Sequence, residues 1–206
     1  MPRYVSVFAL LLVIGLPAGL GAQGTRFGIA FGPSFVGGGD SRTLVDFNGS
    51  NVTGADQSGL HFRAFAEFPL SAPTLSFRTE VFYNTLHSRP NTYAVVNNGT
   101  GATALTDRTF GLTGNFVATL KPEASVTPFF LLGMGVFGSM LGTNPDPMSS
   151  QVTATRGGMG LGLQAGMGMR ARLSQRSSLL FEWRYGQALN NTRGAGFMPL
   201  TVGVTF

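Results

Sequence analysis

The chain of 206 residues contains no cysteine, only two histidines, and few charged residues. Without cysteine there can be no disulfide scaffold, thiol nucleophile or cysteine-based zinc site, and His61 and His87 leave little imidazole chemistry for an enzyme. Charged residues make up 11% of the chain, compared with roughly a quarter in soluble domains. Because 43% of the residues are hydrophobic, the chain can still bury a core, which excludes a disordered protein. This composition disfavours an ordinary soluble globule.

Lysine is nearly absent, since 13 of the 14 basic residues are arginine and the single lysine is Lys121. The formal net charge is +5, but the arginines are spread singly along the chain and form no basic patch, so we expect no nucleic-acid partner. A soluble β-sandwich or lipocalin-like barrel would carry scattered lysine and glutamate on its outer face. The scarcity of lysine therefore argues against these soluble alternatives.

The N-terminal segment has the three-part order of a secretory signal peptide. Arg3 is followed by an apolar run from Tyr4 to Leu16 and then by Pro17 and small residues. The run is short for a helix that must cross roughly 30 Å of hydrocarbon, which disfavours the alternative of an uncleaved anchor. We predict that residues 1–22 are a cleaved signal peptide and that residues 23–206 form the mature domain.

The mature chain alternates between apolar and polar residues with a period of two, which is typical of β-strands. In residues 59–70 the even positions are mostly apolar, whereas the odd positions carry His61, Arg63, Phe65 and Glu67. Such strands have one apolar face and one mostly polar face. The pattern predicts eight strands, at 25–36, 59–70, 75–87, 106–120, 126–138, 156–173, 178–189 and 196–206.

The lengths of the strands and of their connections predict the fold class. A tilted strand needs about 9 to 11 residues to cross a membrane, and each predicted strand has that length or more. The short connections are 71–74, 121–125 and 174–177. The longer connections are 37–58, 88–105 and 139–155, and the last connection is 190–195. This alternation predicts an all-β protein, an eight-stranded antiparallel up-and-down transmembrane β-barrel with short periplasmic turns and long extracellular loops.

Two segments resemble those of a known family. The chain ends at Phe206, with Leu200, Val202 and Val204 on the same strand face, and this resembles the C-terminal signal read by the outer-membrane assembly machinery. The segment TPFFLLGMGVFG at 127–138 is similar to a strand of the OmpA-like and opacity-type small outer-membrane barrels.

The resemblance implies a location in the Gram-negative outer membrane. It also implies lipid and lipopolysaccharide, the assembly machinery and periplasmic chaperones as partners. The chain departs from the family pattern at Phe129, where the family often has tyrosine, and no peptidoglycan-binding domain is recognisable in it.

Charged side chains on the polar faces are expected to fill the lumen. Eight strands enclose an interior just wide enough for side chains, and buried charges need partners. We therefore predict a hydrogen-bonded plug, with a narrow ion path as the alternative. The predicted network comprises Arg63, Glu67, Arg78, Glu80, Arg170, Arg172, Glu182 and Arg184.

Strand registers suggest which of these charges meet. If the first short turn places Leu70 opposite Leu75, Glu67 lies directly opposite Arg78. If the third short turn places Ser174 opposite Ser178, Arg170 lies opposite Glu182. Both registers keep the apolar residues together on the outer face, and this requirement is what fixes the register of paired strands.

Other residue patterns have simpler interpretations. We predict that Tyr83, Trp183 and Tyr185 belong to an aromatic girdle at the membrane surface. The G-x-G-x-x-G match at 133–138 lies on a strand without a following helix, so we expect no dinucleotide cofactor. Two isolated histidines without a third ligand predict no metal site.

The sequence thus predicts a non-enzymatic outer-membrane barrel that serves envelope integrity or surface interaction through its long loops. A narrow channel for small or hydrophobic solutes is the first alternative. A lipid A-modifying hydrolase is the second, with His87, Ser88 and Glu80 as its reactive groups. Neighbouring residues of a strand point to opposite faces, which disfavours His87 and Ser88 as a catalytic pair.

Overall fold

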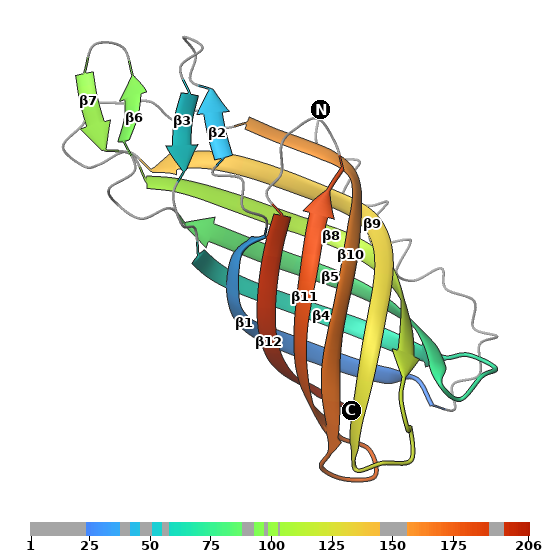
Figure 1. Cartoon of the computed structure of the whole chain (residues 1–206). Helices are drawn as coiled ribbons and strands as arrows, with labels where there is room; N and C mark the ends of the chain where they lie inside the picture. The colour runs from blue at the N-terminus through green and yellow to red at the C-terminus, as the bar shows by residue number, and fades with distance from the viewer. Residues whose placement is uncertain are drawn as a thin grey trace.

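The computed structural model describes residues 24–37, 42–45, 51–54, 58–87, 93–96, 99–102, 104–144, 156–189 and 196–206. Eight long strands close into an antiparallel barrel in which each strand pairs with its neighbours in chain order (Figure 1). The barrel strands are β1 (Arg26–Gly37), β4 (Ser58–Pro69), β5 (Leu75–His87), β8 (Ala104–Thr119), β9 (Val126–Asn144), β10 (Arg156–Arg172), β11 (Ser178–Ala188) and β12 (Gly196–Thr205). The predicted eight-stranded up-and-down barrel is confirmed.

The two ends of the barrel differ in their connections. One end, called the turn end, carries the three short turns and the last residue, Phe206 (Figure 1). The opposite end, called the loop end, carries two small hairpins, β2 (Arg42–Val45) with β3 (Asn51–Gly54) and β6 (Tyr93–Val96) with β7 (Gly99–Ala102). No helix in the described ranges is long and apolar enough to cross a membrane.

The long connections contain more strand structure than the sequence suggested. The hairpins lie within segments predicted as loops, and β8 and β9 stay paired as far as Ala104 and Asn144. Residues 139–144 are therefore strand rather than loop. Continued pairing gives the backbone groups of these residues hydrogen-bond partners beyond the closed part of the barrel.

The strands are staggered around the barrel by ten residues. A path through directly paired residues begins at Val36 and returns to β1 at Arg26. It runs through Val36, Phe197, Gly186, Gln164, Gly133, Asn115, Arg78, Glu67 and Arg26. Such a stagger accompanies strand tilt, typically about 35–45°. Tilt and closure bring inward side chains from distant parts of the sequence to one level of the lumen.

The two faces of the barrel wall differ as the alternation predicted. Large apolar side chains from all eight barrel strands are exposed on the outside, and Phe31, Leu60 and Leu132 expose 68%, 68% and 67% of their surfaces. The inner face buries charged and polar side chains beside phenylalanine and leucine. An exposed apolar belt of this extent is unusual for a soluble monomer and suits a lipid environment.

The short turns explain one correct and one wrong register. Glu67 lies opposite Arg78, as predicted. The predicted pairing of Arg170 with Glu182 is wrong, because Arg170 lies opposite Leu180 and Glu182 lies opposite Gly168.

The β10–β11 turn is centred one residue earlier in the chain than the sequence suggested. The amide of Leu173 donates to the carbonyl oxygen of Ser177 at 3.0 Å, and the hydroxyl of Ser174 accepts from the amides of Arg176 and Ser177. The resulting two-residue shift keeps every side chain on its predicted face, so alternation cannot detect it.

Candidate functional site: the filled lumen

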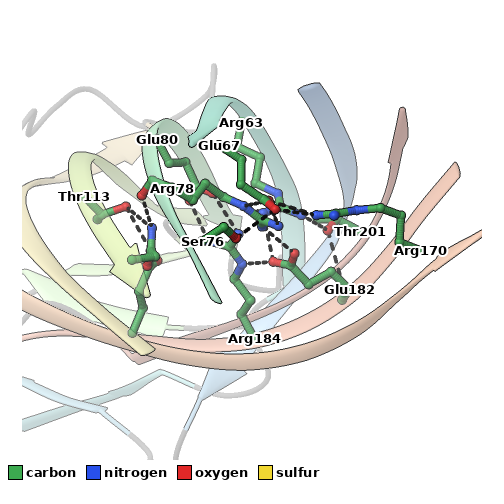
Figure 2. Close-up of polar contacts among 12 residues, drawn as sticks. Arg63, Glu67, Ser76, Arg78, Glu80, Thr113, Arg170, Glu182, Arg184 and Thr201 are labelled. Carbon is green, nitrogen blue, oxygen red and sulfur yellow. Dashed lines mark hydrogen bonds and ion pairs between the residues drawn. The ribbon is translucent and has the colours of Figure 1, made fainter. Parts of the chain in front are cut away.

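Glu67 of β4 anchors the part of the ion-pair network nearest the turn end (Figure 2). Arg78 of β5 donates to Glu67 Oε2 from Nη2 at 2.7 Å and from Nε at 3.0 Å. Arg170 of β10 donates from Nη2 to both carboxylate oxygens, at 3.0 and 2.8 Å, and Ser76 donates its hydroxyl at 2.9 Å. Donors from two other strands therefore hold one carboxylate inside the barrel.

Glu182 of β11 joins this cluster to a second one. It pairs with Arg63 Nη1 at 2.8 Å, with Arg78 Nη1 at 2.9 Å and with Arg184 Nε. Glu80 pairs with Arg63 at 3.1 Å and accepts two bonds from Arg184, at 2.6 and 2.7 Å. Glu182, Arg63, Glu80 and Arg184 thus form a closed ring of ion pairs that spans the lumen.

The network is almost completely buried and carries one excess positive charge. Arg63, Arg78 and Glu182 are each 0% exposed, and four arginines face three glutamates. Phenylalanine rings cover the cations: the Arg78 guanidinium carbon lies 4.5 Å from the ring centroid of Phe65 and 5.4 Å from that of Phe129. Cation–π contacts of this kind stabilise desolvated arginine.

The structure brings seven of the eight proposed network residues together. Arg172 is the exception: it is the last residue of β10, is exposed at the turn end and lies outside the network. Its side chain faces inward by alternation, but its level on the strand places it beyond the buried layer. Alternation predicts the face that a residue occupies and not its depth in the lumen.

An amide cluster beside the network was not singled out from the sequence. Gln164 donates from Nε2 to Thr113 Oγ1 at 2.9 Å and also to Asn115 Oδ1. Asn115 in turn donates to Thr113 Oγ1 at 3.1 Å and to the carbonyl oxygen of Arg78 at 3.3 Å. The available signal was that all three side chains lie at inward positions of β8 and β10.

An aromatic cap fills the lumen between the network and the loop end. It consists of Phe82, Phe137 and Phe197 with His61. The ring centroids of Phe82 and Phe137 are 5.0 Å apart, and the His61 ring stacks on Phe82 at 5.6 Å and on Phe197 at 5.8 Å. The sequence interpretation placed aromatics only in outer girdles, whereas these three phenylalanines occupy inward positions and are buried.

Glycine makes room for large inward side chains at close approaches of the strands. A Cβ atom on Gly168 would lie 2.5 Å from Cζ of Phe129, and one on Gly166 would lie 2.7 Å from Cγ of Arg184. Neither distance is tolerable without a shift of the neighbour, so a side chain at either position would displace part of the lumen filling.

No family model and no curated protein sequence matches the chain. Solved structures do match. Neisserial surface protein A is similar with a TM-score of 0.58 and 13% identity, over 90% of this chain and 97% of that one. A major outer membrane protein from Thermus thermophilus has a TM-score of 0.54 and 14% identity, over 88% of this chain and 98% of that one. The outer membrane protein OprG from Pseudomonas aeruginosa has a TM-score of 0.51 and 12% identity, over 91% of this chain and 98% of that one.

The fold is that of the small outer-membrane β-barrels. The resemblance to OmpA-like barrels that the sequence suggested is confirmed at the level of fold.

In this barrel the three residues assigned to an aromatic girdle lie on the outer face. Tyr83 and Trp183 are 44% and 42% exposed, and Tyr185 is half-buried with its hydroxyl 2.8 Å from Gln187 Oε1. Tyr83 and Tyr185 lie in the halves of their strands nearer the loop end, whereas Trp183 lies at the middle of β11. The two tyrosine positions fit side chains with an apolar body and a polar tip near a membrane surface.

The residues of the proposed assembly signal line the outer face of β12. Val202, Val204 and Phe206 are exposed and Leu200 is half-buried. Phe206 also closes the barrel, because its amide and carbonyl groups exchange hydrogen bonds of 2.9 Å with those of Phe27. The C-terminal strand thus has an apolar outer face and completes the wall.

The residues of the hydrolase alternative are not brought together in the described part of the barrel. His87 is exposed at the loop end of β5, Glu80 is buried in the lumen network, and Ser88 lies outside the described residues. His61 is buried in the aromatic cap. Among the residues whose placement is described, no group of three histidine or acidic side chains could hold a metal ion.

Proposed function

We propose that the protein spans the outer membrane as a structural barrel with a closed lumen, without enzymatic activity. The ion-pair network crossing the barrel is the observation that carries this proposal, because it occupies the space through which a solute would pass. The closed ring of Glu182, Arg63, Glu80 and Arg184 connects three different strands, β4, β5 and β11. The aromatic cap adds a second obstruction nearer the loop end.

The membrane location and orientation are part of the same proposal. The exposed apolar belt and the similarity in fold to outer-membrane proteins both support the membrane location. We place the turn end in the periplasm and the loop end outside the cell, as short turns and long loops are arranged in such barrels. Residues 1–22, which lie outside the described ranges, would serve as the export signal, and β12 would be read by the assembly machinery.

Surface interaction is assigned to the loop end. The β2–β3 and β6–β7 hairpins, which belong to the segments 37–58 and 88–105, lie beyond the barrel wall at this end (Figure 1), and the segment 139–155 begins there. Loops held by a rigid scaffold are the usual place for recognition. We propose that these segments contact lipopolysaccharide or external partners and so contribute to envelope integrity.

Conductance of the refolded protein in planar bilayers tests whether the lumen is closed. We expect the wild-type protein to be silent, because the buried ion pairs leave no continuous aqueous path. Glu67→Ala and Arg170→Ala serve as companion variants, since each removes one side of the cluster nearest the turn end. A silent wild type directs the search for function to the loops.

Steady channels in the wild type, altered in size or selectivity by these variants, would show that the lumen is a path. The narrow-channel alternative would then replace the structural proposal. Bilayers without protein and an Arg108→Gln variant provide the controls, because Arg108 is exposed and lies outside the lumen network.

A further inference from the structure

A cavity of about 390 Å³ lies at the turn end, immediately beyond the buried network. Glu67 and Arg170 form part of its wall, and Arg26, Arg172 and Arg176 also line it. Its size is within the range of pockets that hold small ligands, roughly 300–1,000 Å³. The cavity and the plug therefore share two charged residues.

The charge around this cavity is strongly unbalanced. Among the described residues that line it, four are arginines and Glu67 is the one carboxylate. Arg78 and Arg170 already engage Glu67. No ion pair between Arg26, Arg172 or Arg176 and a described residue occurs.

Arg170 is incompletely satisfied at this position. It is 6% exposed, both of its bonds to Glu67 come from Nη2, and its Nε has no hydrogen-bond partner in the described structure. The adjoining network also carries one more arginine than glutamate. A buried excess of positive charge is stabilised by an anion.

The arginines approach the cavity from different parts of the wall. Arg26 begins β1 and lies opposite Glu67, Arg172 ends β10, and Arg176 lies in the turn that follows. Arginine forks suit carboxylates and phosphates, and several forks from different directions suit a tetrahedral phosphate, with its larger charge and number of acceptors, better than a single carboxylate.

We propose that this turn-end cavity binds a phosphate group, held by Arg26, Arg172 and Arg176 with Arg170 at its inner wall. The phosphate belongs either to a soluble molecule or to the headgroup of an anionic lipid. Binding does not depend on the closed lumen proposed above, whereas the periplasmic position of the site rests on the proposed orientation. Occupancy would neutralise the excess charge of the plug.

Titration of the full barrel in zwitterionic nanodiscs tests the soluble source. Inorganic pyrophosphate at low ionic strength is the probe, and calorimetry together with the NMR signals of the arginine Nε–H groups is the readout. We expect saturable binding, a shifted Arg170 signal and affinity that falls as salt rises. In the variant R26Q/R172Q/R176Q the Kd should rise by about tenfold or more.

Arg108→Gln is the matched control, because it removes an exposed arginine at the other end of the barrel. It should leave the Kd unchanged. All three arginines of the triple variant are exposed, so the barrel should fold, and unfolding in urea verifies this. Nanodiscs that contain phosphatidylglycerol test the lipid source by the same Arg170 signal.

A response to phosphatidylglycerol but not to pyrophosphate would support the site and assign the headgroup as its source. Equal binding by wild type and triple variant, equal weakening by Arg108→Gln, or no response to either probe would overturn the proposal. Equally tight binding of acetate would replace phosphate specificity by general anion binding and would also overturn it. None of these outcomes depends on conductance, so the two proposals fail separately.

Discussion

The two halves of the lumen are filled by different chemistry. In the half near the turn end, four arginines and three glutamates pair across the barrel, and Arg78 contacts two of the carboxylates. In the half near the loop end, Phe82, Phe137 and Phe197 pack with His61, and their ring centroids lie 5.0 to 6.2 Å apart. Both halves exclude solvent, but they do so with interactions that differ in their tolerance of change.

This difference shows how a narrow barrel can be closed in two ways. Removing one member of a buried ion-pair network leaves charges without partners, which is costly in a low-dielectric interior. Trimming an aromatic ring removes contacts and leaves a small cavity, and neighbouring side chains can partly fill it. The charged half should therefore be the less tolerant of the two.

The largest effect is expected from Glu182→Gln in the charged half. This change leaves Arg63, Arg78 and Arg184 without their shared carboxylate and raises the excess positive charge. We expect the free energy of unfolding to fall by about 3–5 kcal/mol. Urea unfolding in lipid bilayers measures it, with the exposed Glu123→Gln as control. A loss below about 0.5 kcal/mol, the range of surface substitutions, would show that the network contributes little to stability.

A smaller effect is expected from Phe82→Leu in the aromatic half. Phe82 contacts His61, Phe137 and Phe197, and aromatic pairs contribute roughly 0.5–1.5 kcal/mol each beyond their buried area. We expect a loss of about 1–2 kcal/mol, because leucine keeps most of the apolar volume. Phe31→Leu on the exposed outer face is the matched control. A loss equal to that of Glu182→Gln would remove the distinction between the halves.

The smallest effect is expected at the boundary of the charged half with the cavity. Arg170→Gln should cost only about 1 kcal/mol, since Arg170 pairs with Glu67 alone and water in the cavity can solvate that carboxylate. Arg78→Gln, which affects two carboxylates deeper in the lumen, should cost about 3 kcal/mol. The same unfolding experiment compares the two variants. Equal losses would mean that water in the cavity does not solvate the Glu67 carboxylate left without Arg170.

Much of the fold could be predicted from the sequence, because alternation specifies both the strands and their faces. The inward positions of Arg63, Glu67 and Glu80 follow from a period of two, and the tight first turn gives the pairing of Glu67 with Arg78. The second register was missed because a two-residue slip preserves every face. The aromatic cap was missed because the inward faces were recognised by their polar residues, and a phenylalanine among polar residues interrupts that pattern.

The sequence by itself determined a closed wall of eight strands, an apolar outside and an inside rich in arginine and glutamate. Tertiary structure alone decided which charges from non-neighbouring strands meet. Arg170 reaches Glu67 across 103 residues of sequence, and Arg78 reaches Glu182 across 104. These strands are not neighbours in the sheet. Their contact depends on closure and stagger, which bring opposite walls of the barrel within reach of long side chains, and no local pattern encodes that approach.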